Sequence, residues 1–161
     1  MKTPRIVDFG IDIYEIFRSI ANSAQSPLLL GIRLYWGWQF MQTGWGKLHN
    51  LPRITNYFVS LGVPFAGFTT PFVSGLEFFG GLLLILGLLS RPIALMLSFD
   101  MLVAYWTADH QAWVSFFRDP GAFYAADPFT FLFASLLILI FGAGMFSADA
   151  FLDQWMYSNF T

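Results

Sequence analysis

The chain has 161 residues, of which 57% are hydrophobic, 20% are aromatic and only 11% are charged, and its mean hydropathy is +0.60. Because a soluble domain carries about 25% charged residues, this composition excludes an ordinary soluble protein and indicates an integral membrane protein with one domain. The net charge of −2 argues against nucleic acid as a partner, and the absence of cysteine excludes disulfides, thiolate metal ligands and a thiol redox relay.

The first predicted element is an amphipathic helix within residues 1–26. Its apolar residues recur at helical spacing, and most of its charged residues lie off that stripe. We expect this helix to lie in the membrane interface, and packing against a partner protein is the alternative. Residues 22–27 are predicted to break it, because Pro27 suits the first turn of a new helix.

Four membrane spans then follow, at residues 27–46, 71–89, 92–108 and 129–146. Nineteen helical residues cover about 30 Å, the thickness of a bilayer's hydrocarbon core. The turn at Ser90-Arg91-Pro92 predicts an antiparallel hairpin, and the loop at 47–70 is predicted to hold a short interfacial helix. The predicted fold is therefore all-α, a transmembrane four-helix bundle over residues 27–146 with an N-terminal amphipathic interfacial helix and a short tail at 147–161.

Four spans place both termini on one side of the membrane. That side carries four basic residues and the other carries three: Lys2, Arg5, Arg18 and Arg91 against Lys47, Arg53 and Arg118. Basic residues favour the cytoplasmic face, so we predict cytoplasmic termini in a bacterial or archaeal plasma (inner) membrane.

Charged residues inside the spans occur at graded depths. From the terminal side, a rise of about 1.5 Å per residue places Arg33 about 9 Å deep, Asp100 about 14 Å, Glu77 about 20 Å and Lys47 about 30 Å. A charge in lipid must be paired, so we predict an Arg33–Asp100 pair and a link from Arg33 or Lys47 to Glu77. These four residues are either registry devices between helices or a polar pocket or proton path.

Two motifs carry a family resemblance: Arg33-x3-Gly37-x2-Phe40-x3-Gly44-x2-Lys47 and Glu77-x2-Gly80-Gly81-x2-Leu84-x2-Gly87-Leu88-x2-Arg91. Together they resemble the DoxX family of small membrane proteins, from about Leu28 to the end of the fourth span. The resemblance implies a four-helix membrane bundle; members of the family include a subunit of a thiosulfate:quinone oxidoreductase and proteins associated with membrane redox complexes. Asp100 lies outside the motifs.

The first functional hypothesis is an accessory subunit of a membrane redox system that interacts with a quinone. Arg33, Lys47 or His49 would donate to the quinone and Glu77 would relay protons. Candidates for an aromatic pocket are Trp36, Phe40, Trp45, Phe78 and Trp106, for which packing in the core and at the membrane surface is the alternative role. No haem, flavin or iron–sulfur motif is evident, so no covalently or metal-bound cofactor is expected and a partner redox protein would bring the electrons.

Two further hypotheses remain open. A bundle with buried charges suits a small proton, ion or solute transporter, which would need a homo-oligomer because four spans are narrow. A non-catalytic assembly partner of another membrane protein needs no chemistry. No metal site is expected, since His49 and His110 lie in separate loops. The residues leave open whether the chain is itself an enzyme.

Overall fold

The computed structural model describes residues 5–160, and every element of secondary structure in that range is an α-helix. Residues 1–4 of the predicted amphipathic segment, with Lys2, and Thr161 of the predicted tail lie outside the described residues. The helices are α1 (Arg5–His49), α2 (Leu51–Ser60), α3 (Ala66–Leu86), α4 (Ser90–Thr107), α5 (His110–Val114), α6 (Pro120–Ala125), α7 (Pro128–Phe141) and α8 (Ala148–Phe160).

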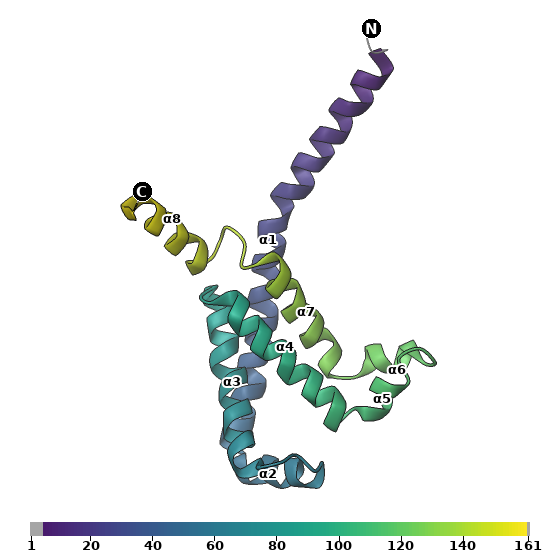
Figure 1. The fold of residues 1–161 in the computed structure, drawn as a ribbon, viewed down its shortest axis with the longest axis vertical. Coiled ribbons are helices and arrows are strands. Elements are labelled where there is room, and N and C mark those ends of the chain that lie inside the picture. The colour runs from purple at the N-terminus through teal and green to yellow at the C-terminus, as the bar shows by residue number, and fades with distance from the viewer. Residues whose placement is uncertain (1–4, 161) are drawn as a thin grey trace.

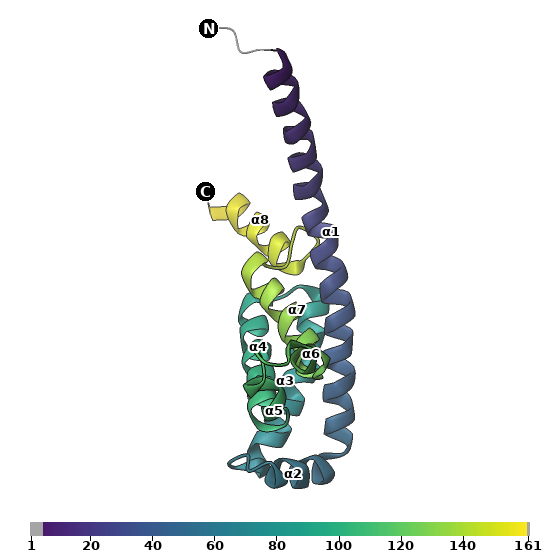
Figure 2. The same ribbon diagram turned by 90° about the vertical axis from the view of Figure 1, so that its right-hand side faces the viewer.

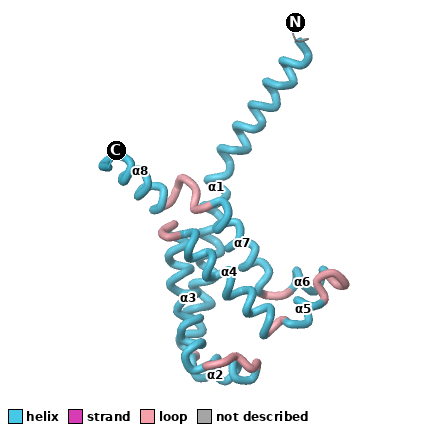
Figure 3. Tube along the Cα trace, viewed as in Figure 1, coloured by secondary structure: helices cyan, strands magenta, loops and turns pink. Residues whose placement is uncertain are grey.

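Helices α1, α3, α4 and α7 form an up-and-down bundle (Figures 1 and 2). Both described ends of the chain lie at one end of this bundle, which we call the terminal end; α2, α5 and α6 lie at the other, the loop end. Connections between the helices are short (Figure 3). The predicted hairpin is confirmed, since α3 and α4 are antiparallel and joined through Gly87–Leu89 at the terminal end.

The predicted break at residues 22–27 is wrong, because α1 runs through Pro27 without interruption for 45 residues. The predicted interfacial helix is instead the N-terminal half of α1, and it projects beyond the other helices (Figure 1). Proline removes only one hydrogen bond from a helix, and proline inside a helix is common where neighbouring groups satisfy the freed carbonyl. The free energy lost with this one hydrogen bond is smaller than the free energy that the helical residues on both sides of Pro27 contribute.

The bounds of other helices also differ from the predicted ones. Helix α3 begins five residues before the predicted start at Pro71, and α7 ends at Phe141 rather than at Phe146, because Gly142 adopts a left-handed φ of 81°. The second predicted loop contains α5 and α6, and the predicted tail folds as α8. The short helix predicted within the first loop is confirmed as α2, with earlier bounds.

By length and apolar composition, α3 alone among the described helices qualifies as a membrane-spanning helix. Helix α7 is apolar but has 14 residues, about 21 Å of helix. Helix α4 has 18 residues and α1 has 45, but neither meets the apolar criterion. The described residues thus form an all-helical fold. Helix length and hydropathy alone do not establish that four helices cross the membrane, as the sequence predicted.

Glycines bring the backbones of α1 and α3 into direct contact. A Cβ added to Gly37 would lie 2.8 Å from the carbonyl oxygen of Gly81, and one added to Gly81 would lie 2.6 Å from the amide nitrogen of Met41. A Cβ on Gly44 would overlap the amide nitrogen of Phe78 and lie 2.7 Å from the carbonyl oxygen of Ser74. Small residues permit this close packing where lipid supplies no hydrophobic force between helices.

The interior is apolar and is shared by the four bundle helices. Its fully enclosed side chains come from α1, α3, α4 and α7: Phe40, Leu84, Ala94, Leu97, Tyr105 and Ile138. Outward-facing positions are also apolar, among them Phe79, Phe99 and Ile140. An apolar outer surface of this extent is expected where acyl chains rather than water surround the helices.

We predict that Gly44→Ala lowers the free energy of unfolding by about 1–3 kcal/mol, because the new methyl group would meet backbone atoms that cannot move aside. Gly46→Ala is the matched control: the same helix offers open space there, and alanine is the better helix former. Unfolding in mixed detergent micelles measures both. Equal effects of the two substitutions would show that the α1–α3 contact is looser than described.

Candidate functional site

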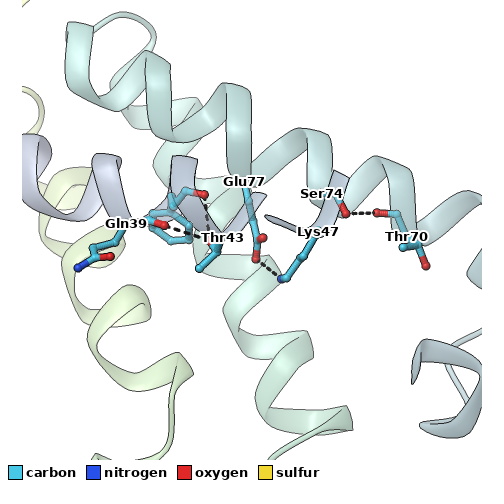
Figure 4. A network of polar contacts seen from close by, with 7 residues as sticks. Gln39, Thr43, Lys47, Thr70, Ser74 and Glu77 are labelled. Carbon is cyan, nitrogen blue, oxygen red and sulfur yellow. Dashed lines mark hydrogen bonds and ion pairs between the residues drawn. The ribbon is translucent and has the colours of Figure 1, made fainter. Parts of the chain in front are cut away.

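A buried ion pair joins α1 to α3 near the loop end. Lys47 Nζ lies 2.6 Å from Glu77 Oε1, and it is the sole ion pair among residues 11–159, whose side chains the structure describes (Figure 4). The Glu77 side chain is 3% exposed and that of Lys47 is 30% exposed. This confirms the predicted link between Lys47 and Glu77. The lysine also stands in the last turn of α1, where a positive charge complements the helix dipole.

The direction of the helices explains why these two residues meet despite a predicted depth difference of about 10 Å. Side chains lean toward the N-terminus of their helix. Helix α1 begins at the terminal end and α3 begins at the loop end, so Lys47 and Glu77 lean toward each other. Two long side chains then close the separation.

The ion pair opens onto a cavity of about 190 Å³ that also contains Asp100 of α4. The other walls come mainly from α2, α3 and α4 and are largely apolar: Ile54, Tyr57, Phe58, Leu61, Val63, Val73, Met101, Val103 and Ala104. Glu77 Oε2 and Asp100 Oδ2 are buried without a hydrogen-bond partner. When all three groups are ionised, the two neighbouring carboxylates carry one more charge than Lys47 can balance.

A second cavity, of about 280 Å³, adjoins the first and shares Lys47, Tyr57 and Glu77 with it. Asp109 and Asp127 line its loop-end side, beyond the ends of α4 and α7. Burial raises the pKa of Asp109, and the nearby Asp127 carboxylate raises it further. Carboxyl groups therefore line the two cavities from Asp109 and Asp127 at the loop end to Glu77 and Asp100 inside the bundle.

Hydroxyl groups near the ion pair bond within their own helices. Thr43 donates to the carbonyl oxygens of Gln39 and Phe40, and Ser74 donates to that of Thr70 (Figure 4). Thr70 Oγ1 itself is buried with no partner. None of these groups hydrogen-bonds to Lys47 or Glu77 in the described structure, so the carboxylate depends on the lysine.

The predicted Arg33–Asp100 pair is wrong. Arg33 is fully buried, and its Nη2 donates to the carbonyl oxygen of Phe146 at 2.5 Å. Arg33 extends to Phe146, whereas Asp100 lines the cavity that contains Lys47 and Glu77, so the two side chains face different parts of the bundle. The region it reaches holds the C-terminal ends of α3 and α7, whose carbonyl groups attract a cation.

Asp149 completes this terminal-end cluster, and the sequence analysis gave it no role. Its carboxylate accepts from the amides of Leu89 and Ser90, at 2.7 and 2.9 Å, and thereby caps α4 from the start of α8. Leu89 has a left-handed φ of 50°, which is unfavourable for leucine, and these bonds hold it there. Gly87, with φ of 69°, lies so close to Arg33 Nη1 that a Cβ would overlap it. No local sequence signal marks an aspartate that caps a helix 60 residues away.

The aromatic candidates do not gather around one pocket. Trp36 and Phe40 pack edge-to-face on Phe131 of α7, and Trp45 lies against Phe78 and His49 on the outside of α1 and α3. Trp106 is 63% exposed and contacts His110. Neither the five aromatic candidates nor His49 lines the cavity that contains Asp100. Their observed contacts are those of packing and surface residues.

Histidine positions offer no metal site among the described residues, where no group of three candidate ligands converges. A ring nitrogen of His49 lies 2.9 Å from the carbonyl oxygen of Trp45, within the last turn of α1. His110 begins α5 at the loop end. The two imidazoles belong to separate aromatic contacts.

We predict that Lys47→Met lowers the free energy of unfolding by about 3 kcal/mol, since it leaves the Glu77 carboxylate buried without its counter-charge. Glu77→Gln alone should also lower the free energy of unfolding. The double variant should lower it by clearly less than the sum of the two single losses. A double-mutant cycle in mixed micelles measures this coupling. Strictly additive losses would mean that the pair contributes no interaction energy.

We predict that Asp149→Ala lowers the free energy of unfolding by about 0.5–2 kcal/mol, which is the usual effect of removing a helix cap. The exposed residue Asp12 provides a control, because Asp12→Ala removes the same charge without a described hydrogen bond. Thermal unfolding in one detergent compares the two. An unchanged midpoint for Asp149→Ala would contradict its role as the cap of α4.

Comparisons with known proteins agree with this architecture. The DoxX family model matches residues 28–110. The inner membrane protein YqjF of Escherichia coli (strain K12) is 32% identical over 116 residues, which cover 71% of this chain and 84% of the relative. No solved structure matches the chain. Arg33, Lys47, Glu77 and Arg91 of the motifs all lie in the matched region. The chain belongs to the DoxX family and is an integral protein of the inner membrane.

Proposed function

We propose that this DoxX-family protein is an accessory subunit of a membrane redox system and that it holds the ring of a quinone beside Lys47, Glu77 and Asp100. In this proposal α3, α4, α7 and the second half of α1 cross the membrane. The observation that carries the proposal is the cavity at the Lys47–Glu77 pair, where two partnerless carboxyl oxygens face largely apolar walls.

The cavity's size supports a single ring. A cavity of about 150 Å³ lined by apolar side chains is large enough for benzene in a well-studied case, and this one is about 190 Å³. Tyr57 and Phe58 of α2 supply aromatic walls. A quinone ring needs such walls together with a few polar groups directed at its carbonyl oxygens.

The chain's own residues suit the proton chemistry of that ligand. A quinone takes up two electrons and two protons to become a quinol. Lys47 has three ammonium donors and one described acceptor, so it can hydrogen-bond a carbonyl oxygen while keeping Glu77. The paired carboxyl groups of Glu77 and Asp100 can hold and release a proton next to that oxygen.

Electrons must come from another protein in this scheme. The chain offers no cysteine and no motif for haem, flavin or iron–sulfur binding, as its sequence indicated. A membrane redox enzyme that carries its own electron-transfer cofactor would supply two electrons per quinone. The exposed apolar residues on the projecting half of α1, such as Ile16, Phe17 and Ile20, provide a surface for that partner.

A cavity-filling variant tests the proposal without altering any charge. Ala104→Phe places a ring inside the cavity, and we expect it to weaken binding of decylubiquinone by tenfold or more. Leu102→Phe on the same helix is the control, since Leu102 is partly exposed and lines neither cavity at the ion pair. Equilibrium binding to the purified protein, followed by tryptophan fluorescence, gives both affinities. Equal affinities for wild type and Ala104→Phe would refute this site.

One observation favours proton transport as a second candidate. The two adjoining cavities connect Asp109 and Asp127 at the loop end with Glu77 and Asp100 inside the bundle. Protein in liposomes should then conduct protons, and Glu77→Gln should abolish the flux while Asp12→Asn leaves it unchanged. Proton flux without quinone binding would select this candidate over the first.

A further inference from the structure

A cleft of about 540 Å³ lies at the terminal end, far from the Lys47–Glu77 pair. The start of α4, the end of α7 and the first turns of α8 enclose it. Its volume falls in the range of ordinary ligand sites. Neither the redox proposal nor the proton route uses it.

Arg91 is the cation of this cleft. It stands in the first turn of α4, is exposed, and has one described hydrogen bond, a long one of 3.4 Å from Nη2 to the carbonyl oxygen of Ile140. A guanidinium has five N–H donors, so most of them stay available. Arginine presents those donors as a planar fork that matches a phosphate group.

Asp153 lines the same cleft from α8. It has no described hydrogen bond, and it forms no ion pair with Arg91, although both face one cavity. The neighbouring Asp149 differs, because its two carboxylate oxygens are taken by the amides that begin α4. The cleft therefore offers one cation and one carboxylate that form no ion pair with each other.

The remaining walls are apolar and continue onto the outer surface of the bundle. Leu89 and Phe141 are 56% and 53% exposed, and Pro92, Leu152 and Met156 complete the lining. Arg91 is the second residue of α4, which begins at the terminal end of the bundle, and the end of a membrane-spanning helix lies near the lipid headgroups. Charges beside apolar walls at this level fit a lipid better than a soluble molecule.

We propose that this cleft binds a phospholipid whose headgroup is a zwitterion with a primary ammonium group, as in phosphatidylethanolamine. Arg91 receives the phosphate, Asp153 accepts hydrogen bonds from the ammonium group, and the acyl chains follow Leu89 and Phe141. Two opposite charges that line one cleft without pairing suit a zwitterionic headgroup better than an anionic one. The bound lipid would join α8 to α4 and so secure the terminal end.

The test uses the full-length protein in detergent with phosphatidylethanolamine, phosphatidylcholine or phosphatidylglycerol of identical acyl chains. Native mass spectrometry counts bound lipid, and thermal unfolding measures stabilisation. We expect phosphatidylethanolamine to bind at least tenfold more tightly than the other two, because a trimethylated ammonium cannot donate to Asp153 and a glycerol headgroup has no cation. Soluble phosphoethanolamine at the same concentration should not stabilise the protein.

Two variants examine the two charges separately. Arg91→Gln should weaken binding of all three lipids, whereas Asp153→Asn should remove the preference for phosphatidylethanolamine and leave the other two unchanged. Arg53→Gln and Asp12→Asn are matched controls outside the cleft. Should Arg91→Gln fail to fold, the exposed position of Asp153 keeps the second variant informative.

Equal or tighter binding of phosphatidylglycerol would overturn the proposal, as would an unchanged lipid preference in Asp153→Asn. Stabilisation by soluble phosphoethanolamine equal to that by the lipid would overturn the assignment to a membrane lipid. Quinone binding by the same samples is an independent measurement, so either proposal can fail alone.

Discussion

The close approach of α1 and α3 is the constraint on which the structure depends. Gly37, Gly44 and Gly81 remove the side chains that would hold the two backbones apart, and the same contact brings Lys47 to Glu77. A buried ion pair offsets its desolvation only with excellent geometry, so a small shift between these helices would leave a buried carboxylate without its counter-charge. The glycines and the ion pair therefore act together. The glycine contacts set the distance between α1 and α3, and the ion pair fixes the register of the two helices.

The two ends of the bundle use charge in different ways. At the terminal end, Asp149 of α8 bonds the amides of Leu89 and Ser90, and Arg33 bonds the carbonyl oxygen of Phe146 through Nη2 alone. At the loop end, the carboxyl groups of Glu77 and Asp100 retain oxygens without partners, and they face cavities rather than backbone. The carboxyl groups at the loop end thus border enclosed space, whereas Asp149 at the terminal end has both carboxylate oxygens bonded to backbone amides.

The match to the DoxX family covers the second half of α1 with α2, α3 and α4, including the charged positions of the motifs, but a fold alone does not assign chemistry. The redox proposal rests on the loop-end cavity and the lipid proposal on the terminal-end cleft, so they depend on different residues. A protein with both would hold a redox ligand at one membrane face and a structural lipid at the other.

The sequence by itself determined the membrane setting, the helical fold, the shared side of the two termini and the Lys47–Glu77 link, because composition, glycine spacing and rare buried charges are local signals. It placed Arg33 beside Asp100 because the depth of a Cα atom does not show which part of the bundle the side chain faces. It expected a break at Pro27, whereas helical residues on both sides carried α1 through. The cap from Asp149, the cavities and the scattering of the aromatic residues depend on contacts between distant segments, which only the tertiary structure decides.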